Sequence, residues 1–106
     1  MFRPRVEIRI FRNRFQLTDE KTGRTIERAA VTPFSSDRML VADHGVASKL
    51  LADLIVELEG RRRLVAWPIA VVHPKELCDD GLCPAEEFVL REMMDALGFA
   101  KVEFAR

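Results

Sequence analysis

A chain of 106 residues with 17 basic and 17 acidic side chains is long enough for one hydrophobic core, so a single domain over residues 1–106 is expected. Its hydrophobic content of 48% is ordinary for a globular protein, and no apolar run reaches the ~20 residues that span a membrane. With two cysteines and no signal-peptide pattern, the sequence predicts a cytoplasmic protein with reduced thiols and argues against a secreted disulfide scaffold.

The charge is uneven along the chain although its sum is zero. Residues 1–30 hold eight Lys or Arg against four Asp or Glu, whereas residues 31–106 hold nine against thirteen, which gives +4 and −4. Such polarity suits head-to-tail contact between copies or an anionic partner for the basic end. The alternative interpretation is a solvated strand face that carries arginines between buried positions. The second interpretation is favoured, because dispersed arginines are common on sheets with one wet face.

Residues 1–31 are predicted to form an antiparallel meander of three strands. In residues 5–10, apolar side chains alternate strictly with charged ones, which is the period of a half-buried strand. A turn at Asn13 leads to a second strand around residues 15–17, since asparagine tolerates the left-handed conformation. A further turn leads to a third strand over residues 25–31.

Residues 38–106 are predicted to form an αβαβ unit. A first helix begins at the N-cap Asp43 and ends at Gly60, with apolar residues at helical spacing between them. The apolar run 64–72 then predicts a strand that effectively starts at Ile69. Because every residue of this run is apolar, helices or other cover are expected on both faces of the strand.

A second helix is predicted from Pro84 to Gly98, followed by a short strand over residues 101–104. Proline suits the first helical turn and glycine the left-handed position that ends a helix. The predicted buried stripe of this helix comprises Phe88, Leu90, Met93, Met94 and Leu97. The complete order, βββαβαβ, predicts an α/β (α+β) fold in which a mixed sheet packs against two helices.

This order is that of the ribonuclease-H-like core, and several segments make the likeness more specific. Val-Ala-Asp at 41–43, Val-Val-His-Pro at 71–74 and Ala-Leu-Gly-Phe-Ala-Lys-Val at 96–102 stand in the order and spacing of a half domain of the MreB family. These are the bacterial rod-shape-determining relatives of actin, within the actin-like ATPase superfamily. The N-terminal hairpin matches only in pattern. The resemblance implies an actin-like half-domain fold.

The resemblance does not extend to the nucleotide site. Actin-like ATPases hold phosphate with an Asp-x-Gly-Thr-type turn between their first two strands, whereas this chain has Phe-Arg-Asn-Arg at 11–14. Their second phosphate loop belongs to another subdomain. A nuclease of the ribonuclease-H type needs converging carboxylates, yet the central strand ends in His73-Pro74. We therefore expect no catalysis, nucleotide or other cofactor.

The expected function is a protein-interaction module that forms a homodimer or docks on a larger partner, linked by its family likeness to cell shape or the envelope. Its predicted contact surface is the sheet edge and the basic hairpin that carries Arg9, Arg12, Asn13 and Arg14. A basic sheet with exposed aromatics also suits single-stranded nucleic acid, but the zero net charge weakens that alternative.

A second alternative is a small metal-binding or redox module. His73, Cys78 and Cys83 form a His-x4-Cys-x4-Cys pattern with three soft ligands for zinc. The spacing is not that of a Cys-x2-Cys knuckle, and Cys83 before a helix could instead be a reactive thiol. We favour metal-free loop cysteines and a strand-end His73 that is bonded to backbone.

Overall fold

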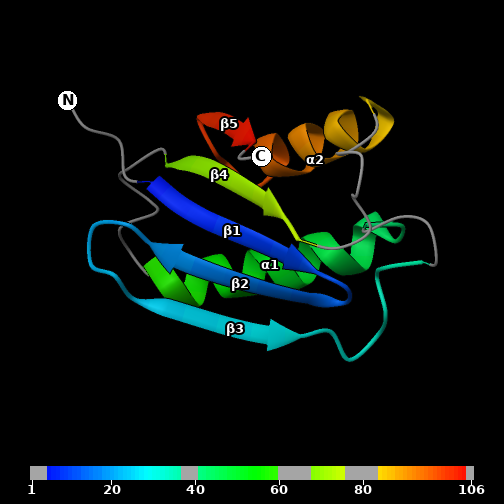
Figure 1. Cartoon of the computed structure of the whole chain (residues 1–106), viewed down its shortest axis with the longest axis horizontal. Coiled ribbons are helices and arrows are strands. Elements are labelled where there is room, and N and C mark those ends of the chain that lie inside the picture. The colour runs from blue at the N-terminus through cyan, green and yellow to red at the C-terminus, as the bar shows by residue number, and fades with distance from the viewer. Residues whose placement is uncertain (1–4, 37–40, 60–67, 76–83, 105–106) are drawn as a thin grey trace.

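The structure of the chain, a computed structural model, is a mixed five-stranded sheet with helices packed on it (Figure 1). It describes residues 5–36, 41–59, 68–75 and 84–104. The elements in chain order are β1 (Arg5–Phe11), β2 (Arg14–Asp19), β3 (Thr25–Ala29), α1 (His44–Glu59), β4 (Ile69–Pro74), α2 (Pro84–Ala96) and β5 (Lys101–Phe104). The predicted order βββαβαβ and the predicted fold class are confirmed.

The sheet has the strand order β3-β2-β1-β4-β5. The central strand is therefore β1, and the prediction that the strand ending in His73-Pro74 is central is wrong, because that strand is β4. β1 and β3 both pair antiparallel with β2, whereas β4 pairs parallel with β1 and β5 pairs parallel with β4. Parallel neighbours cannot be joined by a tight turn, so α1 and α2 form the crossovers that lead into β4 and β5.

Both helices pack on the same face of the sheet, and α1 lies behind the strands in Figure 1. In β1 the alternate residues Val6, Ile8 and Ile10 are fully buried, as the strict alternation predicts. They form one core with residues from both helices, namely Ala47, Leu51, Leu54, Ile55 and Leu58 of α1 and Leu90, Met93 and Met94 of α2. The other face, which we call the open face, is covered by neither helix and is turned toward the viewer in Figure 1.

The two-sided cover predicted for β4 comes from a helix on one side only. Ala70 and Val72 are fully buried on the helix side. Val71 points to the open face and is nevertheless only 8% exposed. Ion-paired Arg5 of β1 and Glu103 of β5 lie on the two strands that flank β4, so their side chains bridge across it. Residues 64–67 of the predicted strand lie outside the described residues.

The predicted start of α1 and the predicted end of α2 are confirmed. The Asp43 side chain accepts a hydrogen bond from the N–H of Val46 at 3.1 Å, as an N-cap does. After α2, Gly98 has a φ of 94°, and the N–H of Phe99 donates to the carbonyl of Met94 at 3.2 Å. Gly60 lies outside the described residues.

One predicted core residue of α2 is wrong. Phe88 is 64% exposed, whereas Leu90 and Met94 are buried. At ~100° per residue, Phe88 lies about 200° around the helix from Leu90 and therefore on the opposite side. The buried stripe begins instead with Glu86, which is 7% exposed in the first turn. The hydrophobicity of Phe88 favours the core, but its helical spacing from Leu90 places it on the exposed side of α2.

Asn13 in the β1–β2 turn is hydrogen-bonded to the segment that follows β3. It has the left-handed φ of 56°, which asparagine tolerates better than most residues. Its side-chain oxygen accepts hydrogen bonds from the N–H groups of Phe34 and Ser35 at 2.8 and 2.7 Å. The Asn13 N–H in turn donates to Ser35 Oγ at 3.0 Å. Phe34 is thereby held against Phe15, with ring centroids 4.8 Å apart and planes 14° from parallel.

Replacing Asn13 should therefore loosen this segment. Asn13→Gly keeps the left-handed backbone but removes the acceptor for two N–H groups, so we expect a loss of ~1–3 kcal/mol in unfolding free energy. Asn13→Asp retains an oxygen acceptor and should lose less. Urea unfolding of the three proteins measures the difference, and equal losses in both variants would contradict the role of the side-chain oxygen.

Candidate interaction face

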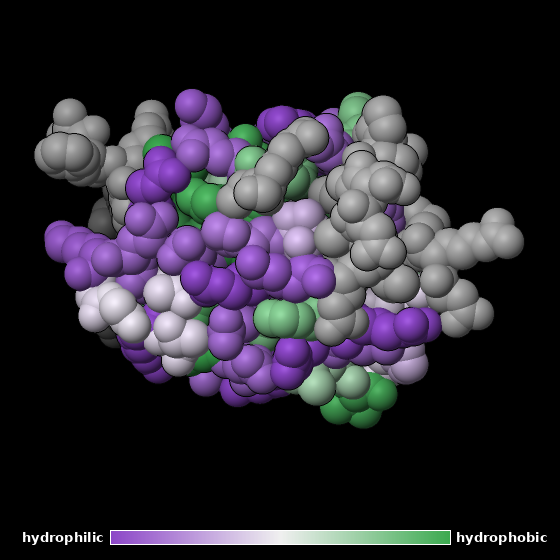
Figure 2. Space-filling model, in the orientation of Figure 1, coloured by the Kyte–Doolittle hydropathy of each residue, from purple (hydrophilic) through white to green (hydrophobic). Residues whose placement is uncertain are grey.

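The open face carries polar side chains from all the strands of the sheet. Because alternate residues of a strand point to opposite faces, these are the residues between the buried ones. They are Arg5, Glu7 and Arg9 of β1, Arg14, Gln16 and Thr18 of β2, Thr25 and Glu27 of β3, His73 of β4, and Lys101 and Glu103 of β5. Figure 2 shows this face as predominantly hydrophilic.

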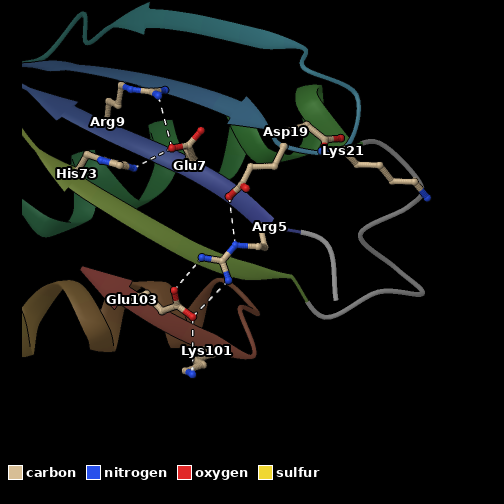
Figure 3. Close-up of polar contacts among 9 residues, drawn as sticks. Arg5, Glu7, Arg9, Asp19, Lys21, His73, Lys101 and Glu103 are labelled. Carbon is tan, nitrogen blue, oxygen red and sulfur yellow. Dashed lines mark hydrogen bonds and ion pairs between the residues drawn. The ribbon is translucent and has the colours of Figure 1, made fainter. Parts of the chain in front are cut away.

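A chain of polar contacts crosses the middle of the open face. The Glu7 carboxylate lies 3.0 Å from His73 Nε2 and 3.5 Å from Arg9 Nη2 (Figure 3). Arg9 also donates to Thr18 Oγ1 at 3.1 Å, and that hydroxyl lies 2.9 Å from the Thr25 hydroxyl. The contact between His73 and Glu7 corrects the prediction that the histidine bonds to backbone. These contacts connect β4, β1, β2 and β3.

A second group of ion pairs lies at the start of β1. Arg5 donates to both carboxylate oxygens of Glu103, at 2.8 and 3.4 Å, and to Glu20 at 3.2 Å (Figure 3). Lys101 Nζ lies 3.7 Å from the Glu103 carboxylate. The hydrogen bond from Arg5 lowers the pKa of the Glu103 carboxyl below its ordinary value. This end of the face is therefore balanced in charge.

The third group lies beside the β1–β2 turn. The Arg14 guanidinium lies 4.1 Å from the centre of the Phe11 ring and donates to Glu27 at 3.2 Å. Gln16 donates to the other oxygen of Glu27 at 3.0 Å. A guanidinium over the face of an aromatic ring is a favourable contact. One face of the Phe11 ring is thus already occupied by a side chain of the same molecule.

The residues predicted as the contact surface do not form one basic patch. Arg9 and Arg14 lie on the open face and pair with acidic side chains, while Arg12 is exposed in the turn. Asn13 holds the segment after β3 and has a structural role. The basic hairpin of the sequence is therefore part of a face with alternating charge.

The metal and redox candidates are brought together only in part. His73 is hydrogen-bonded to Glu7, whereas Cys78 and Cys83 lie outside the described residues. Within the described ranges, no group of three or more His, Cys, Asp or Glu side chains could hold a metal ion. Across the same ranges, no helix has the length and apolar character needed to span a membrane.

On the helix side, Arg28 of β3 and Arg24, which precedes β3, contact the end of α1. Arg28 donates to both oxygens of the Glu57 carboxylate at 2.7 and 3.2 Å. Arg24 donates to the carbonyl oxygens of Glu57 and Leu58 at 3.2 and 3.5 Å, where a cation complements the helix C-terminus. The hydrogen bond from Arg28 lowers the pKa of the Glu57 carboxyl.

The lowered pKa values of Glu57 and Glu103 predict a loss of stability in acid. Both pKa values are below the ordinary 4.5 in the folded protein, so the stabilisation is present above about pH 4.5 and is lost as the pH falls through the folded-state values. The double variant Glu57→Gln/Glu103→Gln should show a shallower fall of melting temperature between about pH 5 and about pH 3. An unchanged slope in that variant would contradict the assignment of the two carboxyls.

Comparison with known proteins shows a relative in sequence and a neighbour in structure. The chain is 33% identical over 92 residues to the uncharacterized protein YjaA of Escherichia coli (strain K12), which covers 82% of this chain and 71% of YjaA. Its fold is similar to that of MreB5 of Spiroplasma citri in the crystal structure bound to ADP, with a TM-score of 0.63 and 12% identity. That match covers 98% of this chain but 38% of MreB5. No protein-family model matches the chain.

At 12% identity the likeness to MreB5 shows the fold alone. The actin-like fold expected from the sequence is therefore supported, and its five-stranded sheet and helices are compatible with a half domain of that fold. The chain spans well under half the length of this neighbour.

Proposed function

The chain belongs to the family of the Escherichia coli protein YjaA, and we propose that it is a non-catalytic protein-interaction module built on an actin-like half domain. The observation that carries the proposal is the open face, where ordered, paired side chains from every strand lie on a surface that neither helix covers. A surface of this kind offers a contact area whose side chains have already lost much of their rotamer freedom. Such preorganisation lowers the cost of binding another protein.

We infer that this chain does not use nucleotide. MreB5 holds ADP in its crystal structure, but the chain corresponds to 38% of that protein. A phosphate cradle needs backbone N–H groups that point at the ligand. In the turn between β1 and β2, the N–H of Asn13 instead donates to Ser35 and its side chain is engaged by Phe34 and Ser35. These contacts argue against a phosphate site in this turn.

The proposal places the module in the cytoplasm, where a reducing environment would keep Cys78 and Cys83 as thiols. Its partner is a second copy or a larger protein, and the link to cell shape or the envelope rests on the MreB likeness. The metal or redox module and the nucleic-acid-binding domain remain alternatives from the sequence.

Nucleotide titration and turnover test the non-catalytic part of the proposal. With Mg-ATP or Mg-ADP at about 1 mM, a concentration far above the usual Kd of a nucleotide site, we expect no heat of binding and no phosphate release. The Asn13→Asp variant is the matched control, because it alters the turn while it retains an oxygen acceptor. Saturable nucleotide binding would overturn the proposal. So would an ATPase activity that copurifies with the wild-type protein and has a different rate in the Asn13→Asp variant.

A further inference from the structure

We propose that the open face is a dimer interface, on which two copies meet around a two-fold axis that crosses β1 between Glu7 and Arg9. The inference rests on the proposed interaction function and names its partner, a second copy of the chain. The inference depends on the order of charges on the open face. In this arrangement, positive side chains of one copy lie opposite negative side chains of the other.

The central strand shows the complementarity most directly. From its start, β1 presents Arg5, Glu7, Arg9 and Phe11 to the open face. A two-fold axis in the interface and perpendicular to β1 reverses this order in the second copy. Glu7 then lies opposite Arg9 of the second copy and Arg9 opposite its Glu7, so the two-fold produces the ion pair twice. Arg5 likewise lies opposite Phe11, a favourable cation and aromatic pair.

The strand on one side of β1 follows the same pattern. Arg14 of β2 is in register with Phe11 of β1. Glu20, just after β2, lies beside Arg5, because its N–H donates to the Arg5 carbonyl at 3.1 Å. The axis therefore brings Arg14 opposite Glu20 of the second copy, which adds another pair of opposite charges on β2.

The strand on the other side of β1 introduces no repulsion. In β4, Val71 is in register with Glu7 and His73 with Arg9, so the axis places Val71 opposite His73 of the second copy. Val71 is 8% exposed, so it adds little buried area to the interface, and the imidazole of His73 from the second copy can cover it. Like charges are not opposed at these positions.

The alternative two-fold arrangement is unfavourable. An axis parallel to β1 places each residue of that strand opposite itself, with Arg5 on Arg5, Glu7 on Glu7 and Arg9 on Arg9. Like charges in direct opposition repel each other and disfavour this arrangement. The charge order thus selects the perpendicular axis.

The size of the face predicts the strength of the dimer. β1 has four open-face positions, β2, β3 and β4 have three each and β5 has two. With strands about 4.8 Å apart and side-chain rows about 6.7 Å apart, these positions give roughly 500 Å² per copy, below the ~800 Å² of a standard interface. Because the pairs are ionic and partly exposed in the monomer, added salt should weaken the dimer. We expect a dimer with a Kd on the order of micromolar.

Charge reversal at the centre of the axis tests the geometry. Glu7→Arg places arginine opposite Arg9, and Arg9→Glu places glutamate opposite Glu7, so each variant alone should dimerise about 100-fold more weakly by sedimentation velocity. Mixing the two variants restores both pairs, and an equimolar mixture should form a heterodimer. Glu92→Arg on the exposed side of α2 is the matched control and should dimerise like the wild type.

Three results would overturn the inference: a wild-type protein that is monomeric at about 100 µM, a wild-type dimer that persists in both single variants, or folded single variants whose mixture stays monomeric. Circular dichroism establishes the fold of each variant. If either is unfolded, Glu7→Gln and Arg9→Gln replace them, each expected to weaken the dimer about tenfold. A dimer on another surface would overturn the inference and leave the proposed interaction function standing, whereas nucleotide turnover would overturn the function itself.

Discussion

Replacing Phe34 by alanine is expected to lower the unfolding free energy by ~3–5 kcal/mol, a large part of the stability of a small domain. The side chain is fully buried and stacks on Phe15, so its removal leaves a cavity next to the sheet. The Phe34 carbonyl also accepts hydrogen bonds from the N–H groups of Ala42 and Asp43, at 2.7 and 2.9 Å. A loosened segment would therefore also disturb the start of α1.

Phe88→Ala is the matched control for this prediction. Phe88 is 64% exposed on the outer side of α2, so its removal should change the unfolding free energy by no more than about 0.5 kcal/mol. Urea denaturation of both variants measures the two effects. Similar losses, or a larger loss for Phe88, would contradict the placement of the two rings.

Ile8→Ala is expected to cost ~2–5 kcal/mol, because Ile8 is fully buried in the middle of the central strand. Ile26 lies on the edge strand β3 and is only partly buried against the core. Ile26→Ala should therefore cost about 1 kcal/mol or less, although the same atoms are removed.

The isoleucine pair tests the strand order, since Ile8 is fully buried on the central strand and Ile26 is partly buried on an edge strand. Thermal and urea unfolding of both variants are sufficient. If Ile26→Ala were as damaging as Ile8→Ala, β3 would not be an edge strand and the order β3-β2-β1-β4-β5 would be wrong.

Local pattern explains why so much of the fold could be predicted. The alternation along residues 5–10 identifies a strand with one wet face, and Asp43 and Gly98 have side-chain or backbone properties that suit helix ends. These signals act within a few residues of the chain. The order of elements then limits the topology, because parallel strands require crossovers.

The charged contacts of the open face could not be predicted in the same way. Arg5 and Glu103 are 98 residues apart in sequence, and Glu7 and His73 are 66 apart. Their pairing depends on the register of β4 with β1 and β5, which no local pattern determines. The sequence therefore suggested a basic hairpin, whereas the folded sheet places acidic side chains from distant strands beside its arginines.

The error in burial at Phe88 and the source of the cover on Val71, which is buried as predicted, have related causes. The hydrophobicity of Phe88 predicts burial, but its angular position on α2 is opposite the buried stripe. The apolar run that contains Val71 suggested two-sided cover, and a helix provides that cover on one side only. On the other side, the aliphatic parts of long charged side chains can shield an apolar residue, which a residue-level pattern does not reveal.

Native mass spectrometry of the untagged, reduced protein, with and without Mg-ATP and a chelator, tests the central claim most directly. The interaction-module proposal predicts a dimer that is free of metal and nucleotide and whose mass is unchanged by either addition. A retained nucleotide would contradict the proposal and assign the function to the β1–β2 turn. Bound zinc whose removal by the chelator also dissociates the dimer would contradict it too, and would assign the function to His73, Cys78 and Cys83.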